Sequence, residues 1–152
     1  PGGKDEKLSN WMLPIFDNLS YLLRDGAEKS GQKKKSKTTS QDRMERLLRE
    51  KTIELEALTY IRGRSIPGQY VIVDEAQNLT PHEVKTIISR AGEGTKMVLT
   101  GDPYQIDNPY LDASSNGLTY VAECLKDLAI QGHIMLRRSE RSTLAAIAAE
   151  RL

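Results

Sequence analysis

The sequence predicts an α/β domain in which a parallel sheet carries helices on both faces. Three short apolar runs, residues 70–73, 96–100 and 133–137, have the length and composition of buried strands. Each run is followed by a stretch whose apolar residues recur every three or four positions, as they do on one face of a helix. Strand and helix therefore alternate, which is typical of parallel strands joined by crossover helices.

The first of these strands is the clearest. Residues 70–73 read Tyr-Val-Ile-Val without polar alternation, so we expect a strand that is buried on both faces. A helix should follow it, because Thr80 can cap a helix, Pro81 suits the first helical position and Glu83 completes a capping box.

Two more helices are expected further along the chain. Asn116 can cap the first, and Ser142 can open a C-terminal one. Their inner faces would contain Leu118, Val121, Ala122 and Leu125 in the first, and Leu144, Ile147 and Ala148 in the second.

The N-terminal third is organised differently. Residues 6–24 have helical apolar spacing, which Pro14 should kink or split. Residues 25–41 contain almost no apolar side chains and five lysines, so we expect a mobile basic loop. A helical pattern resumes over residues 42–50, and residues 52–61 (TIELEALTYI) indicate a strand that leads into a loop.

Composition limits the class of protein. The net charge is +1, with 22 basic and 21 acidic residues. The overall charge therefore gives no indication of a nucleic-acid partner, and only local clusters of charge can. The single cysteine excludes an internal disulfide framework and fits a reducing compartment. No apolar run approaches the roughly 20 residues that a membrane helix needs. We therefore expect a cytoplasmic protein with no membrane partner. We also expect no structural metal, because neither His82 nor His133 has ligand partners at metal spacing.

Two adjacent carboxylates, Asp74 and Glu75, end the first buried strand. In a parallel sheet, ligands bind beyond the carboxyl ends of the strands, where such a pair can hold Mg²⁺ and polarise an attacking water. The alternative is that both residues merely start a loop and cap the next helix. Gly101, Asp102 and Gln105 follow the neighbouring strand and should face the same crevice, which favours a nucleotide site.

Three segments carry a resemblance to a known family. The stretches VIVDEAQNLTPHEVKTIISR, KMVLTGDPYQID and LRRSERSTLAAIAAERL resemble the PhoH-like ATPases, which are similar to superfamily 1 helicases over their nucleotide-binding core. Residues 74–77 (DEAQ) match the Walker B motif, residues 101–105 (GDPYQ) match helicase motif III, and residues 139–142 (SERS) match a later arginine motif. The form in which a PIN-type ribonuclease is fused to a PhoH-like ATPase is the most similar.

The resemblance implies a RecA-like P-loop NTPase fold, ATP and Mg²⁺ as cofactors, and a set of residue roles. Asp74 would hold Mg²⁺ through water, and Glu75 would activate the hydrolytic water. Gln77 and Gln105 would contact the terminal phosphate or its water, and Gly101 and Asp102 would belong to the same nucleotide site. Arg141 would stabilise charge on the transferred phosphoryl group, although a plain surface arginine at a helix start is a strong alternative.

One expected motif has no counterpart. The family's G-x-x-x-x-G-K-[ST] loop, which cradles phosphates, does not occur in this sequence. We therefore interpret residues 1–152 as the C-terminal part of the domain, incomplete at its N-terminal side. We expect weak or absent ATP hydrolysis from this chain alone.

Two functions remain open. One is an ATPase module coupled to RNA remodelling or unwinding, within a homo-oligomeric ring. The other is a non-catalytic fragment that binds nucleic acid or protein. RNA or another single-stranded nucleic acid would contact two groups of basic residues, for which a surface turn and a solvated loop are the alternatives. The groups are Arg62 and Arg64, and Lys33, Lys34, Lys35 and Lys37.

Overall fold

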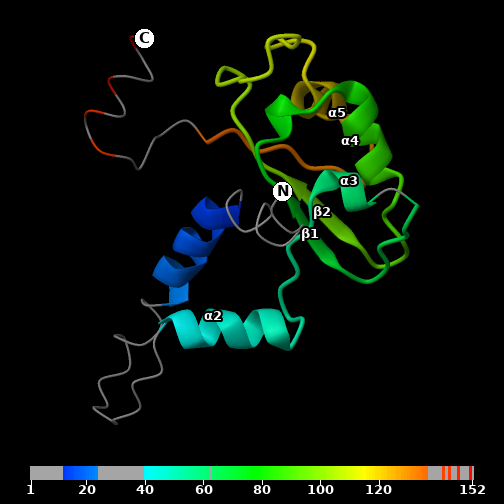
Figure 1. Cartoon of the computed structure of the whole chain (residues 1–152). Coiled ribbons are helices and arrows are strands. Elements are labelled where there is room, and N and C mark those ends of the chain that lie inside the picture. Colours follow the sequence, from blue (N-terminus) through cyan, green and yellow to red (C-terminus); the bar gives the residue numbers. More distant parts are fainter. Residues whose placement is uncertain are drawn as a thin grey trace, which may run out of the picture. The chain divides into compact units, whose positions relative to one another are not determined.

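The computed structural model describes residues 12–23, 40–61 and 63–136, together with the single residues 142, 144, 147 and 151 (Figure 1). The chain divides into two compact units, Pro1–Arg62 and Gly63–Leu152. The alternating strands and helices predicted from the sequence fall in the second unit, and so does the candidate site.

The first unit is helical where it is described. Residues 12–23 form an uninterrupted helix, so within this stretch Pro14 does not split it. The helix α2 (Ser40–Arg49) confirms the helical pattern at 42–50 and includes the last two residues of the predicted loop 25–41. The rest of that loop lies outside the described residues. Arg43 Nη1 donates to the carbonyl oxygen of Leu23 at 3.2 Å, which links these two helices.

The predicted strand at 52–61 is wrong. Residues 54–57 are irregular, and α3 (Leu58–Ile61) is a four-residue helix. Burial alternates from Ile53 to Ala57 as it would in a strand. Among the described residues this segment has no neighbouring strand, and alternation without a hydrogen-bonded partner does not make one.

The second unit contains the predicted pair of parallel strands. The strands β1 (Tyr70–Val73) and β2 (Lys96–Leu99) pair in parallel, with Val71 opposite Met97 and Val73 opposite Leu99. Between them lie a short 3-10 helix, η1 (Ala76–Asn78), and the helix α4 (Pro81–Ile88), and α5 (Gly117–Leu125) follows β2. The strands at 70–73 and 96–100 and both helices are thus confirmed.

Both predicted helix caps are present. The Thr80 hydroxyl accepts from the amide of Glu83 at 3.2 Å, and the Thr80 amide donates to Glu83 Oε2 at 2.9 Å. Asn116 Oδ1 accepts from the amide of Thr119 at 3.0 Å. These bonds satisfy amides that the first turn of each helix would otherwise leave without partners.

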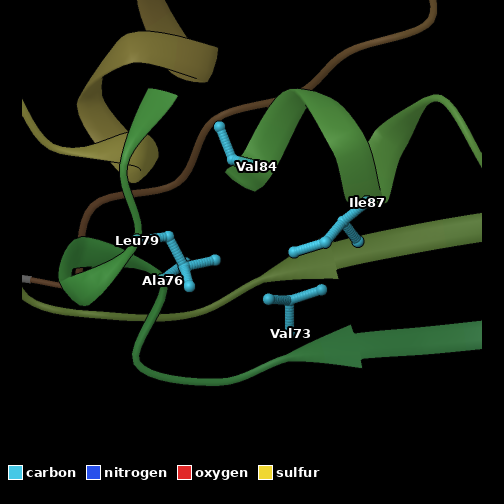
Figure 2. Packing of buried hydrophobic residues seen from close by; sticks show 5 residues of the cluster. All are labelled: Val73, Ala76, Leu79, Val84 and Ile87. Carbon is cyan, nitrogen blue, oxygen red and sulfur yellow. The ribbon is translucent and has the colours of Figure 1, made fainter. Parts of the chain in front are cut away.

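The core lies between the sheet and α4. Val73 from β1, Ala76 and Leu79 from the following turn, and Val84 and Ile87 from α4 converge there (Figure 2). Partly buried side chains complete it, namely Val71, Ile88, Met97, Leu99, Leu118 and Val121. Because Val71 and Val73 alternate with Tyr70 and Ile72 along β1, one face of the sheet is covered.

On the other face the outward side chains of β1 are exposed, and no described helix of this unit covers them, so the predicted helices on both faces are not found among the described residues. Tyr70 is 66% exposed and Ile72 is 63% exposed. Among the described residues of this unit, α4 and α5 supply the helical cover and their core contacts lie on the opposite face. The continuous apolar run was therefore a correct sign of a strand, but in this structure it is not buried on both faces.

The predicted third strand is also wrong as far as it is described. Residues 133–136 are irregular, and Ile134, Met135 and Leu136 are 84%, 67% and 88% exposed. They pair with no described strand, so their backbone has no ladder to join. Leu144 and Ile147 are helical as predicted but exposed rather than inward-facing, and Ala148 lies outside the described residues.

Within the described part of the chain, no helix combines the length and apolar character that crossing a bilayer requires.

Candidate functional site

The candidate site lies where β1 and β2 end. Asp74 and Glu75 follow β1, and Thr100, Gly101 and Asp102 follow β2. Two backbone bonds hold the ends together, since Thr100 N donates to Val73 O and Ala76 N donates to Thr100 O, both at 2.9 Å. The structure thus brings the two predicted clusters to one edge of the sheet.

Asp74 is exposed but fixed. Its Oδ1 accepts from the Thr100 hydroxyl at 2.7 Å and from the amide of Glu75 at 3.1 Å. Its Oδ2 has no hydrogen-bond partner among the described residues. An oriented carboxylate with one available oxygen suits Mg²⁺, which binds proteins through one or two carboxylates and keeps several waters.

The alternative role of Asp74 and Glu75, capping the next helix, is not what the structure shows for α4. Thr80 caps that helix. Glu75 occupies the residue before η1, but its side chain makes no capping bond. The two carboxylates are therefore not required as helix caps.

Glu75 has an unusual backbone. Its φ of 53° and ψ of 39° lie in the left-handed region, where few residues other than glycine occur and where functional residues cluster. Glu75 is exposed, and its Oε2 accepts from Gln77 Nε2 at 2.5 Å. Its other carboxylate oxygen, Oε1, is left for a further interaction.

Gln77 is the buried centre of the site. It is 1% exposed. Besides its bond to Glu75, Nε2 donates to the carbonyl oxygen of Gln105 at 3.0 Å, and Oε1 accepts from the amide of Asp102 at 3.3 Å. Gln77 therefore joins the turn after β1 to the loop after β2.

The loop after β2 is ordered by its own side chains. Asp102 Oδ1 accepts from the amide of Tyr104 at 3.0 Å, and Oδ2 accepts from Gln105 Nε2 at 2.8 Å. The Gln105 side chain is exposed, unlike that of Gln77. A Cβ at Gly101 would lie 2.1 Å from Gln77 Oε1, so glycine makes room for the Gln77 amide.

Two residues of the site were not predicted. Thr100 holds the Asp74 carboxylate in place. In the sequence, the only sign of this role is a hydroxyl side chain directly before Gly101. Asn78 anchors the far end of the loop, because its Oδ1 accepts from the amides of Asp107 at 2.7 Å and Asn108 at 3.3 Å. These contacts join residues about 30 positions apart, so no local sequence pattern indicates them.

Of the basic residues predicted for the site, the structure describes only Arg64, which is exposed. Within residues 12–23, 40–61 and 63–136, no three or more His, Cys, Asp or Glu side chains gather into a metal-binding group. The remaining predicted residues, Arg62, Arg141, Lys33, Lys34, Lys35 and Lys37, lie outside the described residues.

The chain is similar to known proteins along its whole length. It is 53% identical over 153 residues to Protein PhoH2 of Bacillus subtilis and 36% identical over 152 residues to Protein PhoH2 of Mycolicibacterium smegmatis. In both cases all of this chain is covered, but only 32% and 31% of the relative. A PhoH-like protein of Bacillus subtilis is 38% identical over 128 residues, covering 84% of this chain and 34% of that protein.

The chain thus spans about a third of the length of these curated relatives. The family model described as PhoH-like protein matches residues 1–149. Together with the carboxylate pair after β1 and the Gly-Asp-Pro turn after β2, this match shows that the chain belongs to the PhoH-like protein family.

Proposed function

We propose that this chain supplies part of an ATP-hydrolysing site in a P-loop NTPase of RecA-like fold. The observation that carries the proposal is the convergence of Asp74, Glu75 and the loop 101–105 at the carboxyl ends of adjacent parallel strands. This edge is where ligands bind in open α/β sheets. Family membership supports the NTPase class.

Each residue has a distinct proposed role. Asp74 would hold Mg²⁺ through water, with Thr100 keeping its carboxylate in place, and the bound ion would neutralise phosphate charge. Glu75 would take a proton from the attacking water. The exposed amide of Gln105 would reach the terminal phosphate, next to Gly101 and Asp102. Arg141 would stabilise the transferred phosphoryl group from the same or a neighbouring subunit.

Coupling to RNA is the second part of the proposal. Arg62, Arg64 and the lysines between residues 33 and 37 would contact the phosphates of a single strand, and the protein would work as a homo-oligomeric ring. Neutralised phosphates release counterions, so RNA affinity should fall steeply with salt. Support comes from the local concentration of lysines in an otherwise balanced sequence.

The test uses the complete protein with Mg·ATP. Glu75→Gln should keep ATP binding, measured by calorimetry, and lower the hydrolysis rate at least about 100-fold, because the general base is lost. Asp74→Asn should weaken binding of ATP in the presence of Mg²⁺ but not in its absence. Glu93→Gln is the matched control, since Glu93 is an exposed carboxylate in the turn after α4.

Two outcomes would contradict the proposal. If the wild-type protein neither binds nor hydrolyses ATP, the alternative of a non-catalytic interaction module gains. If Glu75→Gln and Glu93→Gln behave alike, hydrolysis takes place elsewhere in the protein.

A further inference from the structure

We infer that Gln77 is a positioning residue, which locks the Glu75 carboxylate to the loop after β2 and does not touch the nucleotide. This differs from the phosphate contact that the family resemblance implies for Gln77. The catalytic consequence rests on the proposed function, whereas the structural lock can be tested without it.

The first support is that the Gln77 amide is already occupied. A glutamine amide has two donor hydrogens and one acceptor oxygen. Nε2 faces two acceptors, Glu75 Oε2 at 2.5 Å and Gln105 O at 3.0 Å. Oε1 accepts from the amide of Asp102 at 3.3 Å. Both hydrogens are used, so Nε2 has no hydrogen left to donate to a phosphate.

The second support is burial. Gln77 is 1% exposed, while Glu75 and Gln105 on either side of it are exposed. A ligand at this edge can reach those two residues directly. It could reach Gln77 only after breaking bonds that a buried amide loses at a cost.

The third support is the space made for the amide. A side chain at Gly101 would lie 2.1 Å from Gln77 Oε1 and 3.3 Å from the amide nitrogen of Ala76. The absence of a side chain at residue 101 therefore allows the loop after β2 to close over Gln77. This approach brings Asp102 and Gln105 within bonding distance of the same amide.

The consequence for chemistry lies at Glu75. A glutamate side chain rotates about three bonds, and a general base works only within hydrogen-bond reach of its proton. Gln77 holds Oε2, which leaves Oε1 as the oxygen that can accept the proton. Without Gln77 the carboxylate would sample other rotamers, so turnover should fall more than nucleotide binding.

The structural test measures amide exchange by NMR in the complete wild-type protein without nucleotide. The side-chain NH₂ of Gln77 should exchange at least about tenfold more slowly than that of exposed Gln105, because both of its hydrogens are bonded and buried. Equal exchange rates would overturn the inference. This measurement needs no variant, so a folding defect cannot obscure it.

The kinetic test compares two variants of the complete protein. Gln77→Met keeps the length of the side chain but removes both polar atoms. It should lower kcat about 100-fold and leave the ratio of ATP to ADP affinity within about twofold of wild type. Gln105→Ala, in contrast, should reduce that ratio, because ADP lacks the terminal phosphate that Gln105 is proposed to reach.

The two hypotheses fail in different ways. If Gln77→Met abolishes the preference for ATP over ADP while Gln105→Ala keeps it, Gln77 contacts the terminal phosphate and the inference is overturned. If wild-type protein shows no ATP binding at all, the proposed function fails, and the exchange rates alone decide whether the lock exists.

Discussion

Gly101 shows how closely two loops approach at this site. Any side chain there must displace the Gln77 amide, which is buried and bonded to three partners. Gly101→Ala should therefore lower the free energy of unfolding by about 1–3 kcal/mol, the usual cost of overpacking. Urea unfolding measures it. Gly132→Ala is the control, since a Cβ there meets nothing within 4 Å, and it should change stability by less than about 0.5 kcal/mol.

A double variant at Gly101 and Gln77 tests whether contact with the Gln77 amide causes this loss of stability. In a Gln77→Ala background the atom that the new Cβ would meet is gone, so Gly101→Ala should cost much less than in wild type. Additive costs would show that the clash lies with the backbone of Ala76 rather than with Gln77.

Asp112 lies further along the loop after β2 and has a strongly perturbed titration. Hydrogen bonds from the Ser114 hydroxyl, the Ser114 amide and then Ser115 lower its pKa from 3.8 to about 2. Ser114 Oγ donates to Asp112 Oδ1 at 2.7 Å. Because the folded-state pKa is depressed, the stabilisation from this carboxylate is complete above about pH 4. It is lost as the pH falls through about 2.

Carboxyl carbon NMR of Asp112 should show this midpoint directly. Ser114→Ala removes the largest contribution, so the pKa should rise towards 3.8 without reaching it, because the Ser114 and Ser115 amides still donate. A wild-type pKa close to 3.8 would contradict these bonds in solution.

At the scale of elements, the features with local causes were predictable. The Thr80–Glu83 capping box and the Asn116 cap depend on residues only three positions apart, and both are present. The strands β1 and β2 follow from short apolar runs, which are rich in β-branched residues in β1. The predictions at 52–61 and 133–136 failed because a strand also needs a partner. Whether a partner is available depends on distant residues that the pattern of one segment does not contain.

The cap of α4 gives a test at this scale. Thr80→Ala removes the hydroxyl that accepts from Glu83 N, and should lower the free energy of unfolding by about 1 kcal/mol. Thr86→Ala is the control in the same helix, where Thr86 Oγ1 donates to His82 O one turn earlier. Alanine is the better helix former, so this change should be neutral or stabilising. Equal losses in thermal or urea unfolding would argue against a specific capping effect.

At the scale of the whole molecule, the site was predictable in outline but not in detail. Parallel pairing of consecutive strands is enough to bring Asp74 and Glu75 close to Gly101 and Asp102. The different roles of Gln77 and Gln105 could not be predicted, because both are glutamines that follow a strand. Only the three-dimensional structure shows one buried and the other exposed. That difference arises from tertiary packing around Gly101.

The exposed outward side chains of β1 lead to a prediction about association. Tyr70 and Ile72 are 66% and 63% exposed on adjacent outward positions of β1, and large exposed apolar side chains favour contacts between molecules. We expect the 152-residue chain to self-associate with rising concentration in sedimentation velocity experiments. Ile72→Lys should shift it towards monomer while changing the free energy of unfolding by less than about 0.5 kcal/mol, since the side chain is mostly in solvent.

A charge-matched control separates this face from a general effect of charge. Ala129→Lys adds the same charge at an exposed position after α5 and should leave association unchanged. If both lysine variants dissociate equally, net charge rather than the face of β1 controls association. If the wild-type chain stays monomeric at every concentration, the exposed Tyr70 and Ile72 are too small a surface to hold two copies together. Their exposure would then be of no consequence for assembly.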